Sequence, residues 1–508
     1  MNPNPDTRKD TLHLMTRTPA LRRLAFSALT GAALLLSQAG AQNATVAVSS
    51  IGNTLDAAVA NFTNTTVAMD HVYDRIINFD DNFEFTPGVA DTWDFTDPLT
   101  FTFTIADGFE FHNGEALRPE DVVFSIERLR DVPRLASVMG NITSTEITGD
   151  REITITLEEE NSTTIRELMA EAHVLNEEYS TSGADWAAEP IGTGPFTVTR
   201  FVPGDRLELS AWDDHPGGAP ALEGITFKSI EEDGNRYIAV ETGEAQLADI
   251  SYHDLERARN NADLEVVEQQ TTNTAFISMN TQKEPFDNVN VRRAMAFATD
   301  REGLASIQGG STPIDSMTPA MFTTYHSAED MPAFDLEEAR SLLEAEGYGP
   351  GNPLEFEAWI YGGNSSVMEA YQALLSAIGV NMSIRNLEFG VFLEGMAQGD
   401  YQMLAGSWNN TTGEPLKALE NYWSGSFGAQ NISFYTNDRT DELYGLALAT
   451  VDEDELLGIA REVQEIAAQD VPVIPTFSSL ALYAFDADLQ GVETYPSGLF
   501  SLRNASFD

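Results

Sequence analysis

The sequence predicts an α/β protein of two or three domains. Strand and helix patterns mix along all 508 residues, a length that can bury several hydrophobic cores. Hydrophobic residues make up 42 % of the chain, as in ordinary globular proteins. Cysteine is absent, so the fold does not depend on disulfide bonds.

Four strands are predicted from short apolar runs. Leu99–Ile105 is the clearest, because threonine alternates with Leu99, Phe101, Phe103 and Ile105, which therefore share one face. The other predicted strands are Thr45–Val48, Leu354–Trp359 and Met382–Leu387.

Helices are predicted between these strands. Pro119 begins one of them, with acidic residues in its first turn, where the positive end of the helix dipole stabilises them. Asp335 and Glu338 form a capping-box pattern ahead of a second helix that ends at Gly347. Periodicity predicts further helices over most of Asp56–Asn78, over Glu369–Ile378 and over Glu453–Ala468.

The N-terminal residues 1–41 have the pattern of a secretory signal peptide. Arg22 and Arg23 precede an apolar run, Leu24–Leu36, that is too short to span a membrane, and Ala39-Gly40-Ala41 follows it. We therefore expect export, cleavage near Ala41 and a periplasmic location. No cysteine at the cleavage point could accept a lipid, so we expect no lipid anchor.

The charge is strongly acidic, with 80 Asp and Glu against 28 Lys and Arg and a formal net charge of −52. Such a surface repels nucleic acids and anionic lipids. It suits high salt, where counter-ions screen the repulsion, so a saline habitat is one hypothesis and a merely acidic secreted protein is the other.

Catalytic motifs are missing from the sequence. It contains no nucleophile elbow, P-loop or His-Glu-x-x-His, and its seven histidines are not spaced as metal ligands. We expect no metal and no cofactor, and a structural role for His112. The sequence therefore favours a binding protein over an enzyme.

Four segments carry a family resemblance, in order along nearly the whole chain after the leader. They are Pro87–Arg128, Ile191–Phe196 (IGTGPF), Ser278–Arg301 (SMNTQKEPFDNVNVRRAMAFATDR) and Ala405–Trp423 (AGSWNNTTGEPLKALENYW). Together they resemble the peptide/nickel-type extracellular solute-binding proteins of ABC importers.

The resemblance implies a fold of the type II periplasmic binding protein class, with two lobes, an additional inserted domain and a hinged ligand cleft. It implies three domains: domain I (42–72, 192–270 and 480–508), domain II (73–191) and domain III (271–479). The hinge is expected at the two crossovers, Thr271–Asn280 and Ile474–Ser479. The implied partners are a small peptide or peptide-like ligand and an ABC permease with its ATPase, and the receptor is expected to be a monomer.

The segment that begins at Trp408 lines the ligand cleft in relatives. In receptors for α-amino peptides an Asp three residues after this Trp pairs with the ligand ammonium, but this chain has Thr411 there. The run Trp408–Glu414 is closer to the glutathione-receptor branch of the family. Glu414 is either a replacement partner for the ligand cation or a cap of a local turn. The predicted ligand-binding residues are Trp408, Asn409, Asn410, Thr411, Glu414, Tyr361, Arg134 and Met139.

Other readings remain open at this stage. The scaffold could bind an oligosaccharide, an opine or a metal chelate, since fold does not determine function. A secreted hydrolase is a second alternative, and a receptor that presents its ligand to a membrane sensor kinase is a third.

Overall fold

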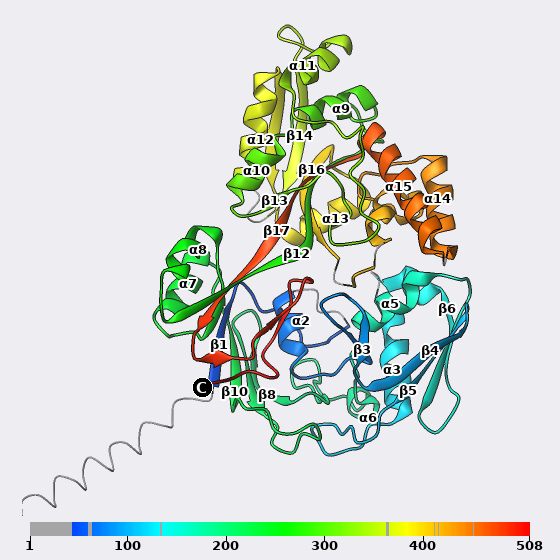
Figure 1. Cartoon of the computed structure of the whole chain (residues 1–508), viewed down its shortest axis with the longest axis vertical. Helices are drawn as coiled ribbons and strands as arrows, with labels where there is room; N and C mark the ends of the chain where they lie inside the picture. The colour runs from blue at the N-terminus through cyan, green and yellow to red at the C-terminus, as the bar shows by residue number, and fades with distance from the viewer. Residues whose placement is uncertain are drawn as a thin grey trace, which may run out of the picture. The chain divides into compact units, whose positions relative to one another are not determined.

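The computed structural model describes residues 43–58, 63–132, 135–361, 365–410, 412–414, 416–450 and 452–507 (Figure 1). The predicted signal peptide lies outside these residues. Among the helices of the described part, none combines the length and the hydropathy that a membrane span requires.

A large mixed sheet joins residues from both ends of the chain and confirms the α/β prediction. It has 11 strands, and β13 (Thr312–Pro313) pairs with β17 at its side. The order of the other strands is β15 (Val380–Asn386), β14 (Leu354–Ile360), β16 (Met403–Asn409), β12 (Leu264–Met279), β17 (Val473–Asp486), β11 (Leu247–Asp249), β1 (Asn43–Val48), β10 (Gly224–Ser229), β9 (Arg206–Ala211) and β8 (Phe196–Val202).

The two long strands β12 and β17 run antiparallel through the centre of this sheet and connect its two halves (Figure 1). Their ladder shifts register between Gln270 and Thr274 and again between Ala275 and Phe276. Such irregularities bend a strand and increase its twist. The shifts fall within the stretch that the sequence predicts as the first crossover of the hinge.

A second sheet of four strands is built from residues 90–157. Its order is β4 (Ala90–Asp97), β5 (Thr100–Ile105), β7 (Glu152–Leu157) and β6 (Ile142–Ile147). In β5, Phe101, Phe103 and Ile105 are buried as the alternation predicts, whereas Leu99 lies before the strand and is exposed. The helix α3 (Pro119–Arg128) begins at the predicted proline.

The chain enters and leaves this second region at neighbouring points, which explains the IGTGPF motif. The amide of Gly194 donates to the carbonyl of Val72 at 2.9 Å. A Cβ on Gly192 would lie 1.9 Å from the same carbonyl oxygen, so only glycine allows this approach. His112 holds the returning chain in place, since its Nδ1 accepts a hydrogen bond from the Gly192 amide and its Nε2 donates one to the Gly194 carbonyl. Its structural role is confirmed.

Most predicted helices are present, and one is largely wrong. The helix α11 (Leu336–Ala345) is capped by the Asp335 carboxylate, as predicted. Of Asp56–Asn78, only α2 (Thr63–Met69) is helical among the described residues, because the backbone after Asp70 pairs with distant segments instead. Tertiary contacts here outweigh local helix propensity.

The remaining elements complete the fold. The helices are α4 (Ala136–Gly140), α5 (Ser162–Glu171), α6 (Glu177–Thr181), α7 (Asp233–Glu241), α8 (Tyr252–Arg259), α9 (Val289–Phe297), α10 (Arg301–Ile307), α12 (Ser365–Ala377), α13 (Phe389–Gln398), α14 (Asp438–Ala449), α15 (Glu453–Asp470) and the 3₁₀ helices η1 (Leu129–Asp131), η4 (Lys417–Tyr422) and η5 (Ser424–Ser426). The short strands are β2 (Ile77–Phe79), β3 (Phe85–Pro87), β18 (Leu489–Gln490), β19 (Glu493–Thr494), β20 (Phe500–Ser501) and β21 (Ser506–Phe507).

The buried side chains form separate hydrophobic cores. One core surrounds Phe101 and Phe103 under the second sheet. Another surrounds Phe196 and Phe227, and a third surrounds Phe286 and Tyr371. Separate cores are what separate domains need.

Candidate functional site

The strands β14 and β16 are parallel neighbours and place Tyr361 and Trp408 at the same edge of the large sheet. Trp408 is half-buried and opposite Thr274 of the central strand β12. Tyr361 is half-buried against Phe392, with 4.6 Å between ring centroids. Both side chains pack against the same apolar cluster, so the structure brings these two predicted site residues to one place.

Asn409 and Asn410 are committed to the protein's own hydrogen bonds. The Asn409 amide donates to the Ser497 carbonyl at 2.7 Å, and its oxygen accepts from the Thr272 hydroxyl at 2.8 Å. The Asn410 amide donates to the Glu414 carbonyl at 2.8 Å and its oxygen accepts from Thr412. These residues therefore shape the segment and tie it to the loop at Ser497.

Glu414 caps a local turn, which is one of the two roles that the sequence left open, and its pairing with a ligand cation stays a prediction. Its carboxylate accepts from the Leu416 amide at 3.1 Å, which caps a local turn, and it lies 3.7 Å from the Arg166 guanidinium. The cation that it faces thus belongs to the protein. Burial raises the pKa of the Glu414 carboxyl to about 7, against the opposing effects of the Leu416 amide and Arg166.

Three further predicted residues lie elsewhere or outside the described part. Met139 is buried in the core under the second sheet, and its carbonyl accepts from Arg130 at 2.7 Å. Arg134 and Thr411 are not among the described residues. The role of Thr411 therefore stays a prediction from the sequence.

A cavity of about 530 Å³ lies beside this segment, and none of the predicted ligand-binding residues that the structure describes is among the residues that line it. Ser497, on its wall, accepts the hydrogen bond from Asn409. Phe83, on another wall, packs closely on Gly413: a Cβ on Gly413 would lie 2.0 Å from the Phe83 ring. The lining residues come from three stretches of sequence: Ala57, Thr66, Asp70, Tyr73, Arg75, Asn78, Phe79, Asp80, Phe83 and Thr86; Ala170, Glu171 and His173; and Glu493, Tyr495, Pro496, Ser497, Leu499, Phe500, Ser501, Arg503 and Asn504.

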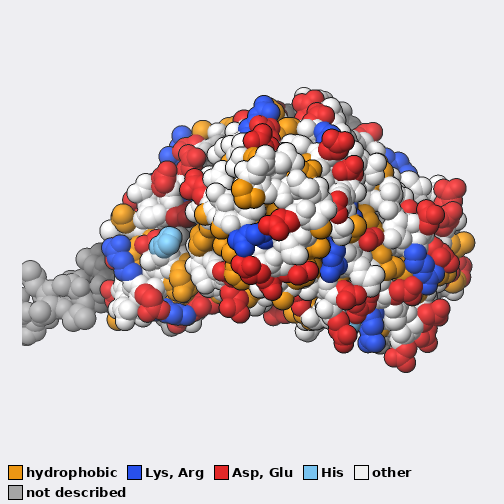
Figure 2. All heavy atoms as spheres, turned by 90° about the horizontal axis from the view of Figure 1, so that it is seen from above, with side chains coloured by type: hydrophobic (Ala, Val, Ile, Leu, Met, Phe, Trp, Pro, Cys, Tyr) orange, Lys and Arg blue, Asp and Glu red, His pale blue; other side chains and the backbone are white. Residues whose placement is uncertain are grey.

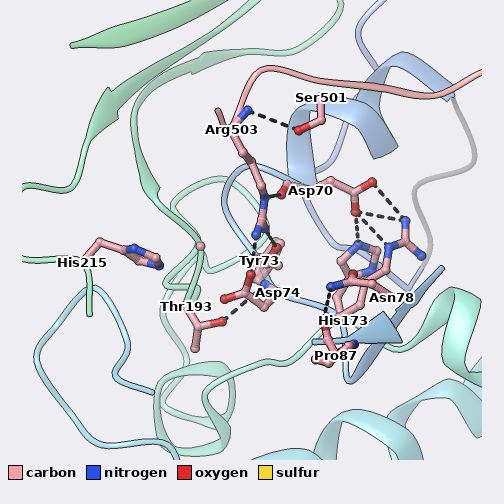
Figure 3. A network of polar contacts seen from close by, with 12 residues as sticks. Asp70, Tyr73, Asp74, Asn78, Pro87, His173, Thr193, His215, Ser501 and Arg503 are labelled. Carbon is pink, nitrogen blue, oxygen red and sulfur yellow. Dashed lines mark hydrogen bonds and ion pairs between the residues drawn. The ribbon is translucent and has the colours of Figure 1, made fainter. Parts of the chain in front are cut away.

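A network of charged side chains forms one wall of the cavity (Figure 3). The Asp70 carboxylate accepts two hydrogen bonds from Arg75 at 3.1 Å and one from His173 at 2.7 Å. Burial by itself would raise the pKa of Asp70, but Arg75 and His173 outweigh it and hold the pKa well below its usual range.

Arg503 holds the same wall from the C-terminal end of the chain (Figure 3). Its guanidinium donates to the carbonyls of Asp70 and Tyr73 at 2.5 and 2.6 Å and to the Asp74 carboxylate at 2.6 Å. The sequence analysis missed this residue because its partners lie more than 400 positions earlier. No local pattern in the sequence indicates such a pairing.

His71 joins α2 to the same C-terminal segment. Its Nδ1 donates to the Val67 carbonyl at 2.8 Å, and its Nε2 accepts from the Leu502 amide at 2.9 Å. These two bonds require the neutral ring, and burial lowers the pKa of His71 to about 4. Across the described ranges, His, Asp and Glu side chains form no group of three or more that could hold a metal ion.

Comparison with known proteins identifies the family. The description "Bacterial extracellular solute-binding proteins, family 5 Middle" matches residues 84–430, which is more than half of the chain. The chain belongs to this family. Family 5 proteins are substrate-binding receptors, and this chain is such a receptor.

Individual relatives agree with this assignment. The glutathione-binding protein GsiB of Salmonella typhimurium is 28 % identical over 489 residues, covering 92 % of this chain and 94 % of that protein. The dipeptide-binding protein of Pseudoalteromonas sp. SM9913, solved with Met-Leu, superposes with a TM-score of 0.84 at 22 % identity over 92 % of this chain and all of that one. NikA of Staphylococcus aureus, solved with Ni(L-His)2, has a TM-score of 0.80 at 19 % identity, again over 92 % of this chain and all of that one. The structural matches confirm the type II periplasmic binding protein fold.

Proposed function

We propose that this receptor captures a short peptide or peptide-like solute and delivers it to an ABC permease and its ATPase at the inner membrane. The observation that carries the proposal is the cavity of about 530 Å³ beside Trp408–Glu414, whose walls carry both acidic and basic groups. A short peptide is zwitterionic and needs groups of both signs. The volume is within the range of about 300–1,000 Å³ typical of small-ligand sites.

The relatives support this ligand class. GsiB is named for glutathione binding, and the protein of Pseudoalteromonas holds a dipeptide. In the proposed site the ligand reaches from the cavity to the neighbouring segment, where Trp408 and Tyr361 contact it and Thr411 hydrogen-bonds it. Asn409, Asn410 and Glu414 hold that segment in shape. Met139 is left out of the proposed site because it is buried in the core under the second sheet.

We propose further that the ligand is enclosed by closure of three domains with the boundaries expected from the sequence. The separate cores, the register shifts in β12 and β17 and the adjacent crossovers at Val72 and Gly192 support this division. Contacts to both lobes would shift an equilibrium between open and closed forms toward the closed form.

Location and the absence of catalysis are part of the same proposal. Export is proposed from the leader that ends near Ala41, which leaves an unanchored monomer in the periplasm. The proposal includes no reaction, so incubation with peptides should return them intact. A presenter of ligand to a sensor kinase and a receptor for a non-peptide solute are the competing readings.

The experiment is native mass spectrometry of the purified protein, followed by calorimetry with glutathione, di- to pentapeptides, an oligosaccharide and a nickel–histidine complex. We expect glutathione or a short peptide to bind and to raise the melting temperature by mass action. Binding of the oligosaccharide or the chelate, with no peptide bound, would contradict the proposal.

The variant Thr411→Asp tests how the ligand amine is recognised. It restores the carboxylate that receptors for α-amino peptides have at this position. We expect it to improve the affinity for free-amine peptides over their N-acetylated forms by about 10- to 150-fold, the range of a charge-assisted hydrogen bond. The isosteric control Thr411→Val should show no such preference. Tight, amine-dependent binding of ordinary peptides by the unaltered protein would mean that its ammonium partner lies elsewhere.

A further inference from the structure

Two ion pairs join the helix α5 to Glu414, the last residue of the proposed binding loop Trp408–Glu414, and to Lys417 just after it. Glu167 of α5 lies 2.8 Å from the Lys417 ammonium, which also lies 3.0 Å from Glu420. The neighbouring residue Arg166 lies 3.7 Å from Glu414. Residues 166 and 167 belong to the proposed domain II and residues 414–420 to domain III, so both pairs cross from one lobe to the other.

These charges are shielded from water. The exposed fractions of the Glu167, Lys417 and Glu420 side chains are 9 %, 18 % and 13 %. The chain has only four lysines, and one of them, Lys417, lies largely buried between two carboxylates. Burial lowers the pKa of the Lys417 ammonium, but the two carboxylates outweigh it and raise the pKa, which keeps the lysine charged.

Each partner is held in place from its own side. The Tyr444 hydroxyl donates to Glu420 at 2.8 Å within domain III. On the other side, the Arg166 guanidinium donates to the Phe83 carbonyl and lies over the rings of Phe79 and Phe85, 5.6 and 5.2 Å from their centroids. One charged group on each side, Glu420 and Arg166, is therefore held by contacts within its own domain.

The order of the charges is complementary. Along α5 it is positive then negative, at Arg166 and Glu167, and the facing segment has negative then positive, at Glu414 and Lys417. A shifted closure would bring like charges together, which is costly away from water. The arrangement thus favours one relative position of the two lobes.

We propose that Arg166, Glu167, Glu414, Lys417 and Glu420, here called the interlobe ion-pair cluster, set the closed position of the receptor and so position the binding loop. This inference rests on the proposed closure of the lobes. The desolvation of buried ions offsets much of their attraction, so the cluster contributes selectivity for one closed form more than net stability. If Lys417 alone is removed, Glu167, Glu420 and Glu414 face one another without that cation, and the closed form becomes unfavourable.

The test uses the absence of cysteine from the chain. Spin labels at Asp94→Cys and Glu394→Cys, both exposed and on opposite sides of the proposed cleft, report the distance between lobes in the ligand-free protein. We expect Lys417→Met to lower the population of the short-distance form at least about tenfold, since breaking a buried pair is strongly unfavourable. The double variant Glu167→Gln/Lys417→Met should recover most of the short-distance population, because it also removes the carboxylate that faces Lys417 from the other lobe.

The matched control is Lys228→Met, which removes an exposed lysine paired with Glu244 and should leave the distances unchanged. Equal distance distributions in Lys417→Met and the unaltered protein would overturn the proposal, as would a double variant no better than the single one. Calorimetry with glutathione separates this result from the ligand assignment. If glutathione and the peptides fail to bind any variant, the proposed function fails while the label distances still decide the role of the cluster.

Discussion

Two buried charge networks in this receptor differ in what they connect. The network of Asp70, Asp74, Arg75, His173 and Arg503 joins α2 and the residues after it to residues 170–173 and to the C-terminal segment (Figure 3). The interlobe ion-pair cluster joins α5 to residues 414–420. In the first network Arg75 and Arg503 donate to backbone carbonyls of the other segments as well as to carboxylates, whereas the pairs that cross the second, Arg166–Glu414 and Lys417–Glu167, join side chains alone. The first therefore belongs to the permanent fold, and we propose that the second separates and reforms as the lobes open and close.

The same difference appears in the acids. The Asp70 carboxylate, whose side chain is 25 % exposed, accepts two hydrogen bonds from Arg75 and one from His173, and its pKa is lowered although desolvation acts in the opposite direction. Glu414 accepts one backbone amide and has its arginine at 3.7 Å, and burial raises its pKa to about 7. Asp70 has more and closer cationic donors and is more exposed than Glu414, 25 % against 5 %, and both differences favour pairing over desolvation at Asp70. Each prediction below tests one side of this comparison.

The largest effect is expected for Arg503→Met. The change leaves the Asp74 carboxylate, whose side chain is 9 % exposed, without its cation, and it removes donors from two carbonyls. Breaking a buried pair costs about 3–5 kcal/mol, and the 29 % exposure of Arg503 places the loss in the free energy of unfolding at roughly 3 kcal/mol. Urea denaturation followed by circular dichroism measures it.

The control for this variant is Arg200→Met, which removes an exposed arginine 3.4 Å from Glu208 and should cost less than about 1 kcal/mol. The spin-label distances should be unchanged in Arg503→Met, because its contacts join domains I and II and do not involve domain III. A variant as stable as the unaltered protein, or one that opens the lobes, would contradict the distinction between the two networks.

A smaller, pH-dependent effect is expected for Glu414→Gln. Because the pKa of Glu414 rises from 4.5 to about 7 on folding, the folded state holds the proton more tightly than the unfolded state. The contribution of the protonated Glu414 to the free energy of unfolding is fully present below pH 4.5 and is lost as the pH rises through 7. Glutamine imitates the protonated acid, so the variant should match the unaltered protein near pH 4.5 and exceed it by about 2–3 kcal/mol at pH 8.

Melting temperatures of both proteins between pH 4.5 and 8 give this difference. His71 and Asp249 have pKa values shifted by burial to about 4 and about 6, but they titrate alike in both proteins and cancel in the comparison. The exposed Glu442→Gln serves as the control. Parallel curves for Glu414→Gln and the unaltered protein would mean that Glu414 stays ionised in the fold.

The sequence predicted the scaffold better than the site. Alternating apolar residues found β5, and the Asp335 cap found α11, because both signals are local. Trp408 was predicted as a ligand contact from a segment that resembles the family, and Tyr361 from its expected place in domain III; both stay predictions. The cavity wall was missed because Arg503 meets Asp74, and His71 meets Leu502, across more than 400 residues. The same contacts explain why Asp56–Asn78 is less helical than its pattern predicts.

The smallest effect concerns the surface rather than either network. Figure 2 shows acidic side chains spread over the visible face, in keeping with a net charge of −52. Acids outnumber bases 80 to 28, so repulsion dominates among exposed charges, and salt should relieve it. The Debye length falls from about 10 Å at 0.1 M to about 3 Å at 1 M. We expect the melting temperature to rise from low salt to 2 M sodium chloride, whereas the differences in melting temperature caused by Arg503→Met and Glu414→Gln persist, because buried pairs are screened much less.

A melting temperature that stays flat or falls would remove the saline-habitat hypothesis. A difference between variant and unaltered protein that vanishes in salt would show that the network concerned is open to solvent.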